Sequence, residues 1–548
     1  MLFQTFDFLL FSIPVIVGFW LLAGRPVART IFLLVASYFF YMAGPKTEPP
    51  PAPWYFAGLL VFSTFLDFHC GKAIYALEDD AESDDEKVAK AAQKKRNRWL
   101  LVSLVGNLGL LGYFKYVNFF VQAFADVMGT FGVSVETFRL DVILPLGISF
   151  YTFQSLSYTL DIWRGRLQPE TSFRRFALFV AFFPQLVAGP IVRASEFLPQ
   201  LHEGPRFTRE NIETGAFRVV RGLVKKVVLG DWVAASLTDR IFDAPDTFTS
   251  PELMLALYAY TLQIYADFSG YSDMAIGLGR MLGFQLPENF DRPYQSRDIA
   301  EYWRRWHMTL SSWLRDYLFF QLLARLGSRA GYFVVWLTMF LVGMWHGASW
   351  NFVIYSNIHA FAMVFNRWNR MRDRDKSWGY KLVFWPPLAA VAFGVVGWLS
   401  HTVVDLPWTQ AWILAGCIVA GMAFVCALPQ RGGWANTVMH IVVTFHLVVI
   451  ARIFFRSPDL DTSKRFIAQI LDWETLGVRP GLASNWVWLA LGFGLAYHFT
   501  PKAWVDVKLQ GLFRKVPGVL LGLAFAALAY GLMKLAEGVP RAFIYFQF

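Results

Sequence analysis

The chain has 548 residues, of which 56% are hydrophobic, 18% aromatic and only 16% charged. An ordinary soluble protein carries roughly a quarter charged residues. The 54 Phe, 22 Trp and 21 Tyr exceed what one water-soluble core can bury without exposing large apolar patches. Composition therefore excludes a single soluble domain and predicts a polytopic membrane protein, in which each span takes about 20 mostly apolar residues.

The formal net charge of +10 indicates basic cytoplasmic loops, and we expect no nucleic-acid partner. The three cysteines Cys70, Cys417 and Cys426 lie in or beside apolar runs without a CxxC motif. This pattern disfavours disulfides and a zinc site, so we expect no bound metal. Residues 1–22 lack the basic start and the cleavage site of a signal peptide, which favours a retained first span.

Apolar stretches predict about fourteen membrane helices along the chain. They lie near residues 8–24, 29–43, 55–76, 99–113, 142–163, 223–242, 251–268, 330–345, 348–366, 383–400, 408–428, 434–455, 484–499 and 517–535. Basic residues concentrate in alternate connections, which places the N-terminus on the periplasmic side and both termini outside the cytoplasm. The stretch 78–98 holds seven acids followed by six bases and predicts a solvated cytoplasmic loop or helical hairpin.

Two stretches are not expected to form simple membrane spans. Residues 183–193 contain two prolines and a glycine in an apolar run that is too short to cross and return. Irregular backbone at membrane depth requires surrounding protein or a water-filled cavity. Residues 267–320 are too polar for spans and too aromatic for a free loop, so we predict amphipathic and re-entrant helices there.

His346 lies between two hydrophobic stretches and is therefore expected at or near membrane depth. An ionisable group there is costly unless it faces a cavity or a partner. Gly343 and Gly347 permit close backbone approach or a break in the helix. Desolvation favours the neutral imidazole, which is the form that a general base requires. A histidine that joins helices by hydrogen bonds is the structural alternative.

His307 lies in a second candidate segment. Asp298 and Glu301 resemble a capping box and predict the start of a helix there. On that helix positions 303, 307, 310, 311 and 314 share one face, which brings together Trp303, His307, Ser311 and Leu314 with Arg304 at the edge. Such a face can bind the carrier of an acyl thioester, and an interfacial helix anchored by Trp and Arg is the alternative.

Other chemistry-bearing patterns are sparse. The acidic residues near the second segment, Asp267, Asp273, Glu288 and Asp291, can orient a histidine or cap short helices. GxSxG, Walker A, HExxH and strand-linked GxGxxG motifs are absent from the sequence. Their absence argues against the hydrolase, ATPase, zinc protease and nucleotide oxidoreductase classes that depend on them.

Six motifs, in this order, resemble the membrane-bound O-acyltransferase family, and in particular its bacterial alginate O-acetylation branch. They are LPLGISFYTFQ at 144–154, FPQLVAGP at 183–190, DFSGYSD at 267–273, NFDRPY at 289–294, YWRRWH at 302–307 and WHG at 345–347. The resemblance covers residues 1–456 as a membrane acyltransferase core. Residues 457–548 are then an extension with about two further membrane helices.

The resemblance implies an all-α ring of about 11–14 transmembrane helices, with re-entrant and amphipathic helices around a thinned centre. In such a fold a cytoplasmic acyl donor meets an acceptor that reaches in from the other face. His346 matches the family's invariant histidine and His307 its second polar position. We expect supporting or substrate-binding roles for Trp303, Arg304, Ser311, Trp345, Asn351, Asp267 and Tyr271.

The expected chemistry is acyl transfer from a thioester to a hydroxyl. His346 would take the hydroxyl proton, and His307 would orient the acceptor or the thioester. The Trp and Asn side chains at 345–351, or backbone N–H groups freed by Gly347, would stabilise the oxyanion. Transient acylation of a histidine is the other route, and the sequence does not separate the two. We expect no bound cofactor, with acetyl-CoA or an acyl carrier thioester as the donor substrate.

The expected function is O-acetylation of an exported polysaccharide from the bacterial inner membrane, with a periplasmic SGNH-like acetyltransferase or an export protein as partner. D-alanyl transfer to teichoic acid and peptidoglycan O-acetylation are the alternatives within the family. A transporter is the alternative from another class, although broken helices in transporters usually come in corresponding pairs from internal repeats. A scaffold without catalysis would leave the buried His346 without a purpose.

Overall fold

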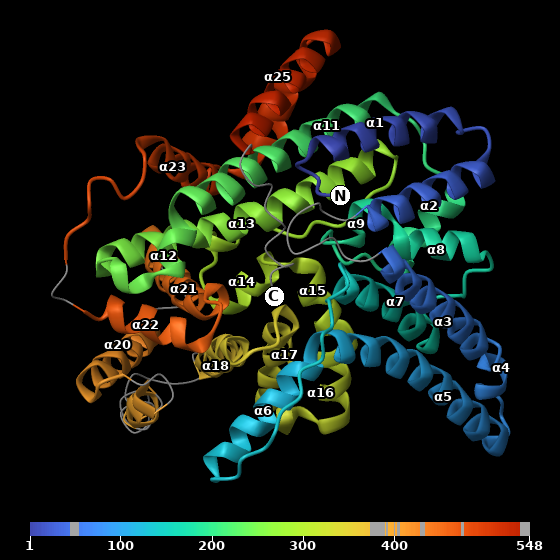
Figure 1. Cartoon of the computed structure of the whole chain (residues 1–548). Helices are drawn as coiled ribbons and strands as arrows, with labels where there is room; N and C mark the ends of the chain where they lie inside the picture. Colours follow the sequence, from blue (N-terminus) through green and yellow to red (C-terminus); the bar gives the residue numbers. More distant parts are fainter. Residues whose placement is uncertain are drawn as a thin grey trace. The chain divides into compact units, whose positions relative to one another are not determined.

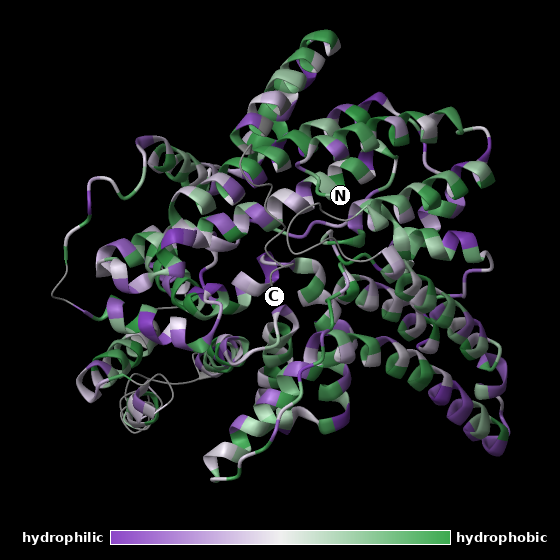
Figure 2. Ribbon diagram, viewed as in Figure 1, coloured by the Kyte–Doolittle hydropathy of each residue, from purple (hydrophilic) through white to green (hydrophobic). Residues whose placement is uncertain are grey.

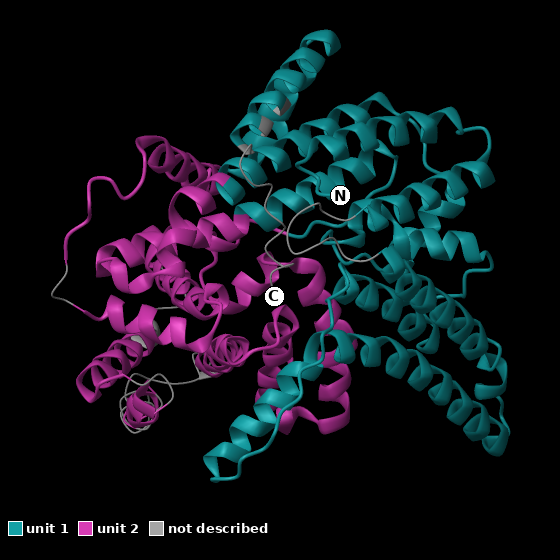
Figure 3. Cartoon of the chain, viewed as in Figure 1, with its two compact units in different colours: residues 1–231, 266–289, 501–548 teal, residues 232–265, 290–500 magenta. Residues whose placement is uncertain are grey.

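The computed structural model describes residues 1–43, 54–372, 390, 393–398, 400–402, 406–427, 433–472 and 476–536. The described residues form α, 3-10 and π helices and contain no strand (Figure 1), which confirms the all-α class. They divide into two compact units that alternate along the sequence (Figure 3). Unit 1 comprises residues 1–231, 266–289 and 501–548, and unit 2 comprises residues 232–265 and 290–500.

Unit 1 is built mainly from the first part of the chain. Its α-helices are α1 (Phe6–Leu21), α2 (Pro26–Met42), α3 (Ala57–Tyr75), α4 (Glu78–Ala81), α5 (Glu86–Leu111), α6 (Val117–Thr130), α7 (Ile148–Trp163), α8 (Phe173–Ala181), α9 (Phe183–Leu186), α10 (Ala194–Glu203), α11 (Arg209–Val224), α24 (Gln510–Lys515) and α25 (Gly518–Ala536). Helix α13 (Ser250–Met281) gives its last sixteen residues to this unit.

Unit 2 holds the first half of α13 and most of the later helices. Its other α-helices are α12 (Asp239–Asp243), α14 (Ile299–Arg305), α15 (Met308–Leu314), α16 (Phe320–Leu326), α17 (Gly331–His346), α18 (Trp350–Arg372), α20 (Trp408–Ala427), α21 (Trp434–Arg456), α22 (Leu460–Ile470) and α23 (Asn485–Phe499). A π-helical turn at Arg315–Phe319 joins α15 to α16.

Most of the predicted apolar stretches are helices whose ends differ from the prediction by a few residues. The stretch near 142–163 is α7, and the stretches near 330–345 and 434–455 are α17 and α21. The stretch predicted near 383–400 lies largely outside the described residues. Apolar run length therefore locates most of the helices, which are coloured largely as hydrophobic in Figure 2.

Helix length limits how many of these elements can cross a membrane alone. Within the described residues, Trp54–Tyr75, Glu86–Thr130 and Trp434–Arg456 are long and apolar enough, and the bent pair Trp504–Lys515 and Gly518–Leu532 would make a fourth span. The apolar helices Phe6–Leu21, Pro26–Met42 and Trp408–Phe424 are shorter. The expected number of 11–14 crossings thus needs more than these long helices, with short or bent helices completing the membrane layer.

The charged stretch 78–98 forms α4 and the first half of α5. The Asp85 side chain caps α5 by accepting a hydrogen bond of 2.8 Å from the backbone N–H of Lys87. Figure 2 shows residues 78–98 as hydrophilic, whereas the rest of α5 is largely hydrophobic. Helix α5 is therefore continuous, and its sequence changes from charged residues in its first half to apolar residues in its second half.

The irregular segment 183–193 begins with the single turn α9 and continues without regular structure. Every residue from Phe183 to Pro190 is buried. A side chain at Gly189 would overlap the backbone of Gln185, so the turn needs glycine at this position. The protein of unit 1 thus surrounds the irregular backbone, as the sequence predicts for a non-helical segment at membrane depth.

Helix α13 corrects one prediction. We expected a span to end near residue 268, yet the helix continues to Met281 through Asp267 and Asp273. Both carboxylates are buried, and both have cationic partners in unit 1. Lys226 Nζ lies 2.5 Å from Asp267 Oδ1, and Arg221 Nη2 lies 2.6 Å from Asp273 Oδ1. The helix tolerates these acids because the ion pairs offset their desolvation, and this pairing cannot be seen in a local hydropathy window.

Glycines allow α11 to approach the last part of α13 closely. A Cβ at Gly270 would lie 2.7 Å from the carbonyl oxygen of Gly222, and a Cβ at Gly277 would lie 2.6 Å from that of Gly215. The two pairs are seven residues apart on each helix, so they lie on one contact face. Small residues at such positions let helix backbones pack tightly in membranes.

We expect Gly270→Ala to destabilise the protein by about 1–3 kcal/mol, because the added methyl group overpacks the α11 contact. Thermal unfolding of the purified full chain in detergent measures the change. The matched control is Gly109→Ala in α5, where a Cβ would meet no atom within 4 Å. Alanine should there be neutral or slightly stabilising, and an equal loss in both variants would contradict the packing argument.

Candidate active site

The candidate site in unit 2 starts at the junction of α17 and α18. Helix α17 ends at His346, and Gly347 takes an extended conformation before α18 begins at Trp350. A Cβ at Gly343 would lie 2.7 Å from Ser356 Cα, and one at Gly347 would overlap the Phe352 ring. Both glycines therefore allow close approach, as the sequence predicts, and the chain reverses tightly after His346.

His346 is enclosed by aromatic rings and is only 1% exposed. The centroid of its imidazole lies 5.1 Å from that of Trp345, 5.4 Å from Phe455 on α21 and 6.1 Å from Tyr355 on α18. Three elements thus position the ring by packing. Enclosure of this kind excludes water and strengthens electrostatic interactions with any group that reaches the imidazole.

The segment around His307 follows the prediction at its start. Asp298 is the N-cap of α14, and its carboxylate accepts a hydrogen bond of 2.9 Å from the backbone N–H of Glu301. The prediction of one continuous helix face is wrong, because α14 ends at Arg305 and α15 begins at Met308. His307 lies between them with a left-handed φ of 44°. Side-chain spacing alone does not reveal such a turn.

The turn brings His307 to the neighbourhood of His346. His307 is fully buried, and its imidazole lies edge-on to Trp345 with centroids 5.4 Å apart. Trp345 is therefore a common neighbour of both predicted histidines. Helices α14 and α15 have seven residues each and are too short to cross a membrane. Burial lowers the pKa of His307 to about 3, so this imidazole is neutral.

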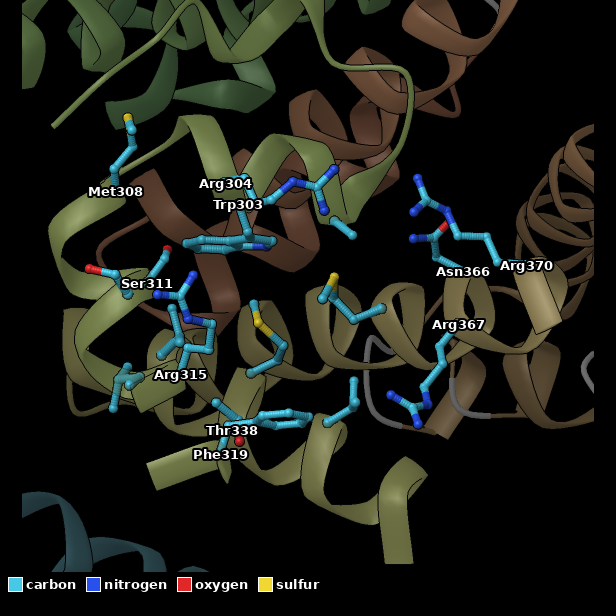
Figure 4. A pocket seen from close by; sticks show the side chains of 17 residues that line it. Trp303, Arg304, Met308, Ser311, Arg315, Phe319, Thr338, Asn366, Arg367 and Arg370 are labelled. Atoms are coloured by element: carbon cyan, nitrogen blue, oxygen red, sulfur yellow. The ribbon is translucent and has the colours of Figure 1, made fainter. Parts of the chain in front are cut away.

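Trp303, Arg304 and Ser311 line a cavity of about 1200 Å³ in the same unit. Figure 4 shows the Trp303 ring at its centre, with arginine side chains on several sides. The lining comes from α14, α15, the π-helical turn, α17 and α18, and His307 is not part of it. The break after α14 thus separates the buried histidine from the cavity-lining residues that spacing had placed on its face.

The cavity is apolar at its wall and basic at its polar positions. Four arginines and one asparagine line it, and no acidic residue does: Arg304, Arg315, Arg367, Arg370 and Asn366. Arg370 pairs with Asp298, and Arg315 Nε lies 2.7 Å from Asp316. Within the described chain Arg304 and Arg367 have no carboxylate partner, so the cavity carries net positive charge.

Asn351 is buried but its amide is already engaged. Its Nδ2 donates a 3.0 Å hydrogen bond to the Ser457 carbonyl, and its Oδ1 accepts a 3.1 Å hydrogen bond from Ser463. These bonds join the start of α18 to α21 and α22. The geometry gives Asn351 a positioning role for the turn that follows His346.

Asp267 and Tyr271, the other two predicted site residues, belong to unit 1. Asp267 pairs with Lys226, and Tyr271 stacks on Phe3 with centroids 4.4 Å apart. Each has partners within its own unit that account for its burial. Their expected roles in the reaction stay predictions.

Two buried residues near the site were missed by sequence reasoning. His359 on α18 is 1% exposed, and its ring centroid lies 4.6 Å from Tyr355 and 5.3 Å from Trp303. Arg452 on α21 is completely buried. Both lie within stretches predicted as spans, so the argument applied to His346 would have identified them as ionisable groups at membrane depth.

Comparison with known proteins bears on this geometry. The family model described as MBOAT, the membrane-bound O-acyltransferase family, matches residues 164–391, which include both predicted histidines and the cavity. A probable alginate O-acetylase of Pseudomonas putida is 38% identical over 415 residues, covering 74% of this chain and 78% of that protein. The chain belongs to the membrane-bound O-acyltransferase family. It is therefore a membrane protein and an O-acyltransferase, as the six motifs predict.

Two further relatives of this O-acyltransferase extend the comparison. A probable alginate O-acetylase of Pseudomonas aeruginosa is 40% identical over 376 residues, which cover 67% of this chain and 66% of that protein. A peptidoglycan O-acetyltransferase of Helicobacter pylori is 34% identical over 401 residues, covering 67% and 70%.

Proposed function

We propose that this O-acyltransferase takes an acetyl group from a cytoplasmic thioester and passes it across the bacterial inner membrane toward an exported polysaccharide. A periplasmic SGNH-like acetyltransferase is the partner we propose to complete the transfer. The observation that carries the proposal is the enclosure of His346 and His307 around Trp345, in the same compact unit as an arginine-lined cavity.

One histidine is enough to carry the proton through the proposed acyl transfer. As the acceptor hydroxyl attacks the thioester carbonyl, its proton passes to His346 and a C–O bond forms. The C–S bond then breaks, and the leaving thiolate takes the proton from the imidazolium. General base catalysis of this kind contributes roughly 10²–10⁴ in rate. A route through an acyl-histidine uses the same ring as a nucleophile.

His307 suits a positioning role in this scheme. Its ring is neutral at physiological pH. The ring packs against Trp345, the residue that precedes His346 in the sequence. A neutral imidazole donates from one nitrogen and accepts at the other. It can therefore orient a hydroxyl or a thioester carbonyl without adding charge to a buried site.

The cavity supports a phosphate-bearing donor. Coenzyme A and the phosphopantetheine of an acyl carrier both combine an anionic phosphate with an apolar arm that ends in the thioester. Guanidinium groups bind phosphates with paired, charge-assisted hydrogen bonds. Arg304 and Arg367 have no carboxylate partner among the described residues, and together with the apolar wall they match both parts of such a donor.

The names of the relatives favour acetyl as the acyl group. Two of them are named as probable alginate O-acetylases and the third as a peptidoglycan O-acetyltransferase. Both acceptors are extracytoplasmic glycans. We therefore propose a hydroxyl of an exported glycan as the final acceptor, with alginate as the first candidate.

We expect His346→Ala to lower acetyl transfer by 10²–10⁴, because the hydroxyl loses its base. The assay uses proteoliposomes that enclose alginate oligosaccharides and the periplasmic SGNH-like acetyltransferase proposed as the partner, with labelled acetyl-CoA outside. His307→Ala should cause a smaller loss, and the exposed His69 in unit 1 provides a control as His69→Ala. A folded His346→Ala variant with undiminished transfer would remove His346 from the reaction. Passage of labelled solute without acetyl-CoA turnover would favour a transporter.

We expect Arg304→Ala and Arg367→Ala each to raise the KM for acetyl-CoA about tenfold with little change in kcat, because a charge-assisted bond to the carrier is lost in ground and transition states alike. The effect should shrink at high salt. Arg325→Ala is the control, since Arg325 is an exposed arginine of α16 that does not line the cavity. A fall in kcat at constant KM would contradict a donor-binding role.

A further inference from the structure

Arg452 carries a buried charge that no carboxylate among the described residues balances. Its guanidinium lies 4.7 Å from the Trp306 ring centroid and 5.2 Å from that of Phe455. Nη2 donates a 2.9 Å hydrogen bond to Tyr302 Oη. Nε and Nη1 are buried and have no acceptor among the described residues. The three N–H bonds on these two nitrogens thus have the hydroxyls of Tyr294 and Tyr355 nearby and no carboxylate of the described chain.

The contrast with Arg456, one helical turn further along α21, is informative. Arg456 Nη2 lies 2.8 Å from Asp239, whereas Arg452 has no carboxylate partner in the described part of the chain. Four tyrosines surround Arg452 and contribute only dipoles: Tyr260, Tyr294, Tyr302 and Tyr355. Removing an ion from water without a counter-charge is costly, so Arg452 indicates a negative group that is not among the described residues.

Further unsatisfied polar atoms lie beside Arg452. Trp303 Nε1 and both ring nitrogens of His359 are buried without a hydrogen-bond partner in the described chain, and Tyr355 Oη has the Arg452 guanidinium beside it. The His359 ring packs against Tyr355, Trp303 and Tyr302, the last of which binds Arg452. More than 90% of buried polar groups in proteins are hydrogen-bonded. The concentration of unsatisfied polar atoms around Arg452 points to a polar ligand there, and most of these atoms are hydrogen-bond donors.

The position of this donor cluster relates it to the reaction. Tyr355 belongs to the cluster and also contacts His346, and Phe455 contacts both His346 and Arg452. Trp303 also lines the cavity that we propose for the donor. The cluster therefore adjoins both the cavity wall and the aromatic rings around His346.

We infer that Arg452 binds the oxyanion that forms on the acyl carbonyl during transfer, with Trp303 and Tyr355 as additional donors. When the hydroxyl oxygen bonds to the carbonyl carbon, the C=O π electrons move to oxygen and create this charge. They return to re-form C=O as the C–S bond breaks, and Arg452 keeps its protons throughout. A preorganised donor at such a charge contributes roughly 10²–10³ in kcat. This inference rests on the proposed function.

A purely structural role is the competing explanation, because Arg452 also ties α21 to α14 through Tyr302. Two donor analogues separate the explanations. S-carboxymethyl-CoA carries a carboxylate oxygen where S-acetonyl-CoA carries a methyl group, so the pair differs mainly in charge. Their affinities for the full chain in lipid nanodiscs can be measured by calorimetry.

We expect the unaltered chain to bind the carboxymethyl analogue at least tenfold more tightly than the acetonyl analogue. Arg452→Met should abolish this preference, leave acetonyl affinity within about threefold, and lower kcat by 10²–10³ at similar KM. Arg452→Lys should restore part of the preference. Tyr302→Phe removes the structural hydrogen bond but leaves the guanidinium, so it should keep the preference.

The outcomes against the inference are distinct. An unchanged preference in Arg452→Met, or equal affinity of both analogues for the unaltered chain, would overturn the oxyanion role. Loss of the preference in Tyr302→Phe, together with unfolding of Arg452→Met, would assign Arg452 to structure alone. If neither analogue binds the unaltered chain while a carrier-protein thioester does, the acetyl-CoA donor of the proposed function is wrong, and the Arg452 inference in this form falls with it.

Discussion

The cost of placing a charge away from water governs both units of this protein. In unit 1 the buried acids Asp267 and Asp273 have cations within ion-pair distance, and a helix that hydropathy would end near residue 268 therefore continues to Met281. In unit 2 the buried Glu252 is paired in the same way with Arg479. His307 is neutral through burial, and Arg452 keeps its charge without a carboxylate among the described residues. Paired charges thus build the fold in both units, whereas the Arg452 charge marks the place where chemistry is proposed.

Close packing explains how His307 and His346 come to lie against the same group of aromatic rings. Gly343 lets α18 approach α17, and Gly347 lets the chain turn directly after His346. The left-handed turn at His307 then brings a second imidazole against Trp345. Trp303, on the helix before that turn, faces the basic cavity instead. A donor held there and a base held among those aromatic rings would be separated by a few side chains, which is the arrangement that acyl transfer needs.

The sequence was informative where the determinants are local. Apolar run length located most helices, and the Asp298 cap and the glycines around His346 behave as predicted. Determinants that join distant parts of the chain could not be found from the sequence. The ion pairs that extend α13 join residues about 40–50 positions apart, and the positive φ of His307 leaves no trace in side-chain spacing. His359 and Arg452 were overlooked although they lie in predicted spans, where any ionisable group calls for an explanation.

The central claim is that one compact unit holds both the donor carrier and the reacting carbonyl. A cryo-electron microscopy map of the full chain in nanodiscs with S-acetonyl-CoA bound tests it most directly. We expect phosphate density beside Arg304 and Arg367, and a ketone oxygen within hydrogen-bond distance of Arg452, with its carbon next to His346. Density for the analogue at a surface that contacts none of these four residues would contradict the account.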